Sequence, residues 1–155
     1  MNVDRLNQFL QIGANIGVLL SIAFLAFELG QNRDMIRAQT RHDLASGITD
    51  LLIAEASDDA LLDLIVRSDQ SLEISAVERL KVDLFRNARF RYWEDMHYQY
   101  RTGLYDEIEF STQIEAIRST LAVARSMVEY WCRTRNRYSP EFAEEIDSLL
   151  TTYSC

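Results

Sequence analysis

The chain has 155 residues, 48% of them hydrophobic and 26% charged, so it is long and apolar enough to fold around a core of its own. Its net charge of −8 argues against binding to nucleic acid, whose phosphates an acidic surface repels. One proline and five glycines are fewer than short strands and tight turns would use, and this scarcity favours long helices.

Residues 6–27 carry no formal charge. A helix of about 20 residues crosses a bilayer core. Between Ile12 and Phe27, nine residues are Ile, Leu, Val or Phe, and they favour insertion by roughly 3 to 5 kcal/mol. Asn15, Ser21 and two glycines offset part of this gain. The sequence therefore predicts one transmembrane helix, within a membrane anchor at residues 1–30 that contacts the lipid bilayer.

Two other interpretations of this stretch stay open. It could be a core helix buried inside a soluble helical oligomer. It could also be a cleaved signal peptide, although the apolar run is longer than the usual 7 to 15 residues and no small-residue cleavage pattern follows it.

Small residues recur every four positions in this helix, at Gly13, Gly17 and Ser21. That spacing keeps them on one stripe and lets another helix approach closely. Asn15 adds an amide that would seek a partner inside lipid. We therefore expect a helix-packing interface of Gly13, Asn15, Gly17 and Ser21, through which the protein associates with another membrane protein or with itself.

Three arginines, Arg33, Arg37 and Arg41, follow the apolar stretch, whereas only Arg5 precedes it. They suit contact with anionic lipid headgroups. Because positive charge stays on the cytoplasmic side, they predict an external amino terminus and a large cytoplasmic domain. From His42 onward the chain is acidic, with 12 basic against 21 acidic residues.

The two cysteines, Cys132 and Cys155, make a poor disulfide framework, and free thiols in a reducing compartment agree with a cytoplasmic domain. Lys81 is the single lysine among 16 basic residues, a usage typical of a GC-rich bacterium. The expected location is therefore the bacterial inner membrane.

Residues 31–155 are expected to form a helical bundle domain. Apolar residues at three- and four-residue steps continue the first helix to about Leu52, and a short helix at 60–67 follows a turn at 57–59. Ser75 and Glu78 form a capping box that opens the longest helix of this domain, which reaches about Thr102 before Gly103. Its predicted apolar stripe comprises Val77, Leu80, Leu84, Ala88, Tyr92 and Met96.

Three more helices are expected at 106–124, 126–137 and 140–150. Ser139 is the predicted N-cap of the last one, and Pro140 its first residue. The predicted fold is all-α, with one N-terminal transmembrane helix that continues into a soluble bundle of about five further helices.

A polar and aromatic face on the long helix is the main candidate ligand site. Glu94, His97, Tyr98 and Arg101 share this face, and Arg89 lies nearby, so together they could bind a small anionic ligand. The alternative is structural: aromatic rings fill the core, and arginines pair with acidic residues of 106–115. The arginines at 131–137 could bind a phosphate, but they are explained better by their favourable interaction with the negative C-terminal end of a helix.

Glu94 and His97 also match half of the Glu-x-x-His pattern of di-metal bundles, but no second pair exists, because Gln39 precedes His42, the only other histidine, by three positions. Zinc-ligand spacing, a nucleophile elbow, a phosphate loop and a dinucleotide motif are absent from the sequence. We expect no metal, no cofactor and no catalytic residue.

Several segments support a resemblance. They are Phe27-Glu-Leu-Gly-Gln-Asn32, Tyr92-Trp-Glu94, Tyr98-Gln-Tyr-Arg-Thr-Gly-Leu104, Trp131 and Tyr138-Ser-Pro-Glu-Phe142. Over most of its length the chain resembles an uncharacterised bacterial family with an N-terminal membrane helix followed by an all-helical domain. The resemblance implies an anchor and a helical domain, and no activity.

The expected function is that of a single-pass membrane-anchored accessory or scaffold subunit that associates with other membrane proteins. One alternative is a membrane-tethered sensor or enzyme that binds a small anionic ligand through the helix face described above. The other is the soluble helical oligomer.

Overall fold

The computed structural model describes residues 3–150 and residue 155. Six α-helices and one short 3-10 helix make up this part of the chain, and no strand occurs in it. The predicted all-α class is therefore confirmed, together with the long apolar helix at the N-terminus. The chain divides into two compact units, Met1–Gln39 and Thr40–Cys155.

Helix α1 spans Val3–Ala56 and contributes to both units. It contains no proline, and neither Gly30 nor Gly47 interrupts it, so the predicted continuation beyond the apolar stretch is confirmed. The units divide at Gln39, further along the chain than the predicted domain boundary at residue 30. The first buried side chain that the structure describes in this helix is Leu44, so packing begins well after the apolar run ends.

Side-chain caps start the next two helices where the sequence places them. Helix α2 spans Asp59–Asp69, and the Asp58 carboxylate accepts the Leu61 N–H at 2.9 Å. Helix α3 spans Ala76–Arg101, and the capping box of Ser75 and Glu78 is present. Gly103, with a φ of +74°, lies just past its end in the left-handed region, which glycine adopts without a steric penalty.

Helix α4 spans Glu107–Val123, and the Asp106 carboxylate accepts N–H groups of its first turn. Helix α5 spans Arg125–Thr134, with the 3-10 helix η1, Arg135–Arg137, after it. Helix α6 spans Pro140–Leu149 and has the predicted proline at its start. The Ser139 hydroxyl makes no capping bond; the Glu94 carboxylate instead accepts the Ser139 N–H at 2.7 Å.

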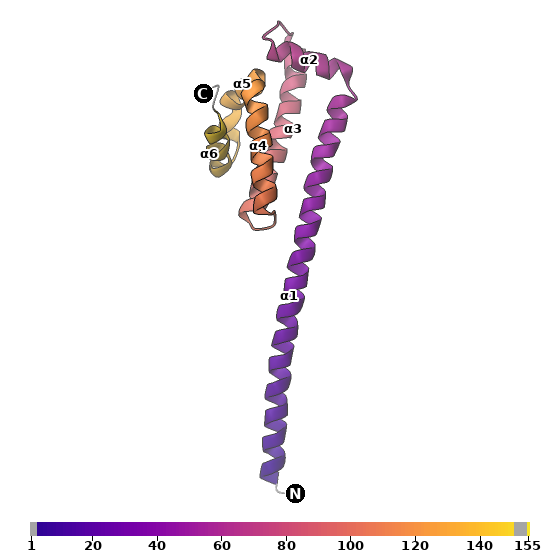
Figure 1. Ribbon diagram of the computed structural model, residues 1–155, viewed down its shortest axis with the longest axis vertical. Helices are drawn as coiled ribbons and strands as arrows, with labels where there is room; N and C mark the ends of the chain where they lie inside the picture. Colours follow the sequence, from indigo (N-terminus) through magenta and orange to yellow (C-terminus); the bar gives the residue numbers. More distant parts are fainter. Residues whose placement is uncertain (1–2, 151–154) are drawn as a thin grey trace. The chain divides into compact units, whose positions relative to one another are not determined.

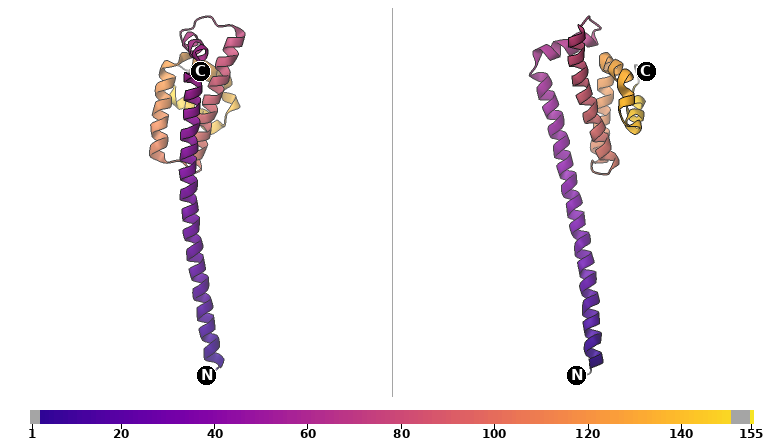
Figure 2. Two further views of the ribbon diagram at one scale, coloured as in Figure 1. Left: turned by 90° about the vertical axis from the view of Figure 1, so that its right-hand side faces the viewer. Right: turned by 180° about the vertical axis from the view of Figure 1, so that it is seen from behind.

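Within the second unit, α3 contacts α2, α4, α5 and α6, so it lies at the centre of the bundle (Figures 1 and 2). Phe90, Trp131 and Phe142 are almost completely inaccessible to solvent. The ring centroids of Phe90 and Trp131 lie 5.0 Å apart, and those of Trp131 and Phe142 lie 5.7 Å apart. Asp147 accepts the indole N–H of Trp131 at 2.8 Å, which satisfies the polar atom of this buried side chain.

The end of α1, from Thr40 onward, belongs to the same bundle. Leu44 is buried, and its carbonyl oxygen accepts a hydrogen bond from the Tyr92 hydroxyl at 3.0 Å. The Tyr92 ring also packs over Gly47, where an added Cβ would lie 3.5 Å from it. Gly47 is therefore the position of α1 against which the Tyr92 ring of α3 packs.

The predicted apolar stripe of α3 is wrong as far as Ala88, which is exposed; of its members only Met96 is buried, and Tyr92 is half-buried. Val77, Leu80 and Leu84 are 78%, 58% and 62% exposed. The hydrophobic pattern missed the true buried face because a buried arginine lies within it, and the pattern assigns charged residues to solvent. That face consists of Val82, Arg86, Phe90, Trp93, Met96 and His97.

The expectation of two free thiols is also corrected. Cys132 in α5 and Cys155 form a disulfide, with Cα atoms 5.2 Å apart. Their separation of 23 positions in sequence gives little indication of their distance in space, because η1 contacts both α5 and α6 and brings the chain back beside α5.

Candidate functional site

The apolar part of α1 has no cover in the structure. Every residue from 7 to 39 is exposed, including Leu19 at 66%, Leu20 at 66% and Phe24 at 61%. Within the described part of the chain, α1 is the one helix long and apolar enough to cross a membrane. A soluble protein rarely leaves so long an apolar surface in water, so this segment is a candidate contact surface for lipid or protein.

The predicted interface residues of this helix lie on two faces rather than one. Gly13 and Gly17 have no heavy atom within 4 Å of an added Cβ, and the Ser21 hydroxyl donates to the Gly17 carbonyl at 2.8 Å. Asn15 is two residues from both glycines, which places it about 160° around the helix from them. It shares its own face with Gln8 and Gln11, so the predicted interface consists of a small-residue stripe and a separate amide face.

The three arginines expected to contact lipid headgroups differ in surroundings. Arg33 is exposed in the first unit. Arg37 is also exposed there, and it is not without an interaction partner. Arg41 belongs to the bundle, where its guanidinium pairs with Glu109 at 2.7 Å although its side chain remains 71% exposed. Arg41 thus has a partner within the bundle, and headgroup contact by all three arginines stays a prediction.

The predicted ligand face on α3 is not assembled as a binding site. Arg89 pairs with Glu55 of α1, and its guanidinium lies 5.2 Å from the centre of the Phe85 ring. Arg101 pairs with Glu141 of α6 at 3.2 Å. Both arginines thus connect helices, and their partners lie on α1 and α6 rather than in the expected acidic segment 106–115.

The other three residues of that face also have structural surroundings. The Glu94 carboxylate accepts hydrogen bonds from Arg91 at 2.6 Å and from the Ser139 N–H. Burial alone would raise the pKa of this carboxyl, but these bonds hold it below the usual value. His97 is buried between Phe110 and Phe142, and burial lowers its pKa. Tyr98 is 58% exposed. These contacts favour the structural alternative for this face, and ligand binding by it stays a prediction.

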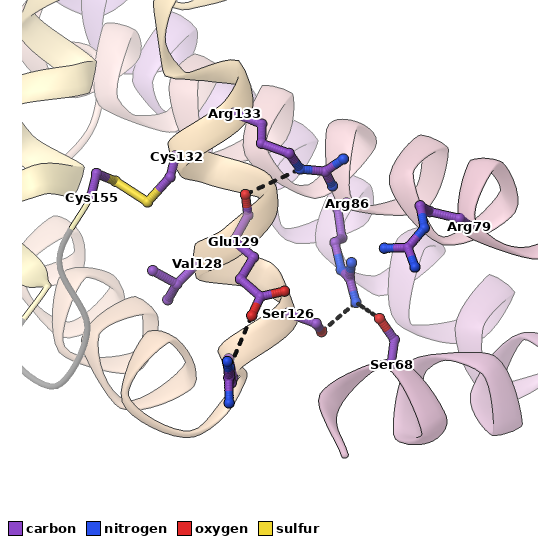
Figure 3. A pocket seen from close by; sticks show the side chains of 10 residues that line it. Ser68, Arg79, Arg86, Ser126, Val128, Glu129, Cys132, Arg133 and Cys155 are labelled. Atoms are coloured by element: carbon purple, nitrogen blue, oxygen red, sulfur yellow. Dashed lines mark hydrogen bonds and ion pairs between the residues drawn. A yellow bond between two sulfur atoms is a disulfide. The ribbon is translucent and has the colours of Figure 1, made fainter. Parts of the chain in front are cut away.

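A cavity of about 680 Å³ lies between α2, α3 and α5, and the sequence analysis did not anticipate it. Four arginines from two helices surround it, with two serines and one glutamate (Figure 3). The lining residues are Ser68, Arg79, Arg86, Arg125, Ser126, Val128, Glu129, Cys132, Arg133 and Cys155.

Arg86 is the buried member of this group, at 5% exposure. One of its amino groups donates to the hydroxyls of Ser68, at 3.2 Å, and Ser126 (Figure 3). Asp69 in turn accepts the N–H of Ser126 at 3.2 Å and also its hydroxyl. Burial lowers the pKa of Arg86, while the nearby Asp69 and Asp83 oppose that shift. The guanidinium is therefore fixed in place by hydroxyl groups from two other helices, α2 and α5.

The remaining arginines of the cavity are exposed. Arg125 pairs with Glu129 at 2.9 Å, and Arg133 pairs with Asp83 at 3.2 Å. The Arg79 side chain makes no hydrogen bond or ion pair with any residue that the structure describes, and in Figure 3 its guanidinium extends toward Arg86.

The sequence contained only a weak signal for this cavity. Arg79 and Arg86 are seven residues apart, and Arg125 and Arg133 eight, so each pair shares a helix face. Nothing in the sequence shows that the two faces meet. Of the arginines in the run 131–137, Arg133 lines the cavity, whereas Arg135 pairs with Asp147 at 2.9 Å.

Neither known protein families, nor curated proteins, nor solved structures contain a match to this chain. The resemblance to an uncharacterised bacterial family therefore stays a prediction. No group of three or more His, Cys, Asp or Glu side chains that could hold a metal ion occurs among the described residues.

Proposed function

We propose that this protein is a single-pass protein of the bacterial inner membrane. Its α1 helix crosses the bilayer, and its helical bundle serves as an accessory or scaffold subunit, without catalysis, for another membrane protein or a second copy of itself. The observation that carries this proposal is the complete exposure of residues 7–39, which include the apolar stretch.

Lipid is the environment that fits this stretch. In water its large apolar side chains would form a contiguous patch, which soluble monomers rarely tolerate beyond a few hundred Å². Inside a bilayer the same side chains contact acyl chains, and the helix satisfies its own backbone hydrogen bonds.

The polar groups of the helix support a protein partner within the membrane. The side-chain amide of Asn15 has no hydrogen-bond partner among the described residues, and an unpaired amide is costly in hydrocarbon. Gly13 and Gly17 leave open space on the opposite side, where a second helix could approach closely. Two such faces would let one helix contact two neighbours.

The bundle also offers a protein partner an apolar surface. Val77, Leu80 and Leu84 are exposed at spacings of three and four residues, so they form a row along α3. A scaffold subunit needs such a surface outside the membrane as well as within it.

For orientation we place the bundle in the cytoplasm, because more arginines follow the apolar stretch than precede it. The disulfide between Cys132 and Cys155 favours the opposite side, since thiols in the cytoplasm are kept reduced. The two features therefore make opposite predictions about the same domain.

Cell fractionation tests the proposal directly. The full chain should sediment with membranes and stay there after an alkaline carbonate wash, which removes peripheral proteins. Leu20→Asp should release much of it, because a central aspartate costs roughly 2.5 to 3.5 kcal/mol, comparable to the whole gain from the span. Gln31→Asp, outside the apolar stretch, is the matched control and should remain in the membrane. Recovery of the unchanged protein as a cytosolic oligomer would favour the soluble alternative.

A further inference from the structure

The arginine-lined cavity has a charge that differs from the rest of the protein. Its lining contributes four arginines against one glutamate, whereas the chain as a whole carries a net charge of −8. Asp69 and Asp83, which contact lining residues, neutralise part of this positive charge. The remaining positive charge is concentrated where α3 faces α5, so an anion would be attracted to this place on an otherwise acidic domain.

Arg86 supplies a preorganised donor. Its contacts with Ser68 and Ser126 hold one amino group, while the nearest partner of the other, Asp83, lies 3.7 Å away, beyond hydrogen-bond distance. The Ser68 hydroxyl accepts from Arg86 and donates to no residue that the structure describes. An oxyanion in the cavity could therefore accept from a guanidinium and a hydroxyl that are already in position.

The exposed arginines can be recruited at small cost. Arg79 has no competing partner within the described chain. The side chains of the Arg125–Glu129 pair are 55% and 56% exposed, and that of Arg133 is 51% exposed. Exposed ion pairs contribute no more than about 1 kcal/mol, so a doubly charged ligand could displace their carboxylates.

The cavity has room for more than a bare ion. Its volume of about 680 Å³ falls within the range of small-molecule sites, and a second hollow of about 260 Å³ shares Ser68, Arg79, Arg125 and Glu129 with it. Val128 adds an apolar wall. We propose that this cavity binds a phosphate-bearing ligand, whose phosphate lies between Arg79 and Arg86 and whose remainder extends toward α5.

The test uses the full chain in phosphatidylcholine nanodiscs, with inorganic pyrophosphate as the probe at low salt and binding measured by calorimetry. The unchanged protein should bind pyrophosphate, and Arg79→Gln should weaken binding about tenfold, the effect of losing one charge-assisted contact. Arg79→Gln should fold normally, because this side chain is exposed and has no described partner to lose. Arg118→Gln, which makes the same charge change in α4, is the matched control and should bind normally.

A second arm separates a soluble ligand from a lipid headgroup. Nanodiscs that contain phosphatidic acid are compared with pure phosphatidylcholine by thermal unfolding. The cavity is assigned to a headgroup phosphate if phosphatidic acid stabilises the protein against thermal unfolding while pyrophosphate does not bind. Arg79→Gln should then abolish this stabilisation, and Arg118→Gln should preserve it. The proposal is overturned if neither probe binds, or if the two variants affect both probes equally.

Discussion

At the scale of single residues, the bundle depends on a few aromatic side chains. Phe90 lies on the central helix and stacks on both Trp131 and Tyr130. It is also in edge-to-face contact with Trp93. Because these neighbours come from α3 and α5, one ring joins the two helices that supply the arginines of the cavity.

Phe90→Ala should therefore destabilise the bundle strongly. Removal of a fully buried phenyl ring costs about 3 to 5 kcal/mol, since the rigid surroundings leave a void. Urea unfolding of the full chain in mild detergent, followed by the fluorescence of the tryptophans, measures the change. Leu84→Ala, on an exposed position of the same helix, should cost less than about 1 kcal/mol. Equal losses in the two variants would contradict the assigned core.

His97 should make stability depend on pH. Burial, opposed by Glu145 and Glu141 and assisted by Arg101, holds its folded-state pKa below the ordinary 6.5. Below about pH 6.5 the unfolded chain therefore binds a proton that the folded chain does not, so the free energy of unfolding falls as pH drops. Above that pH this residue contributes no slope.

His97→Phe should flatten the decline between pH 6.5 and 5 in a series of urea titrations, because phenylalanine keeps a ring between Phe110 and Phe142. Glu94, whose pKa lies below its ordinary 4.5, contributes its own loss only at lower pH. A variant that declines as steeply as the unchanged protein would show that another group is responsible.

At the scale of elements, helix boundaries followed from local chemistry and buried faces did not. Ser75 caps α3 as predicted, and Asp58 and Asp106 cap α2 and α4 within a residue or so of the predicted helix starts, because capping involves residues a few positions apart. The burial of Arg86 and the pairing of Cys155 could not be predicted because their surroundings come from distant segments: Ser126 around the first, and Cys132 beside the second. The contacts of Glu141 and Phe142 of α6 with the predicted ligand face on α3 were not foreseen for the same reason.

The two faces of α1 can be tested separately. Gly17→Ile should weaken helix association at least about fivefold, or about 1 kcal/mol, by preventing close approach at the small-residue stripe. Ala23→Ile is the matched control, because it places a large side chain outside both faces. Förster transfer between labelled copies in nanodiscs measures self-association, and quantitative co-purification measures a different partner. Loss of association in Asn15→Leu alone would assign the contact to the amide face instead.

At the scale of the whole molecule, two features predict opposite orientations. The arginines that follow the apolar stretch place the bundle in the cytoplasm. The Cys132–Cys155 bond fits an oxidising compartment. The chemical state of these two cysteines in living cells therefore reports on topology as directly as a reporter fusion does.

With the bundle in the cytoplasm, both thiols should be reduced in cells quenched with acid, and a polyethylene-glycol maleimide should add to each. The double variant Cys132→Ser/Cys155→Ser should show no shift on a gel, and a green fluorescent protein fused after residue 155 should fluoresce. Unlabelled cysteines together with an active alkaline phosphatase fusion would place the bundle outside. Cys132 and Cys155 both line the arginine-rich cavity. The same measurement therefore also shows whether the disulfide or two free thiols line that cavity in living cells.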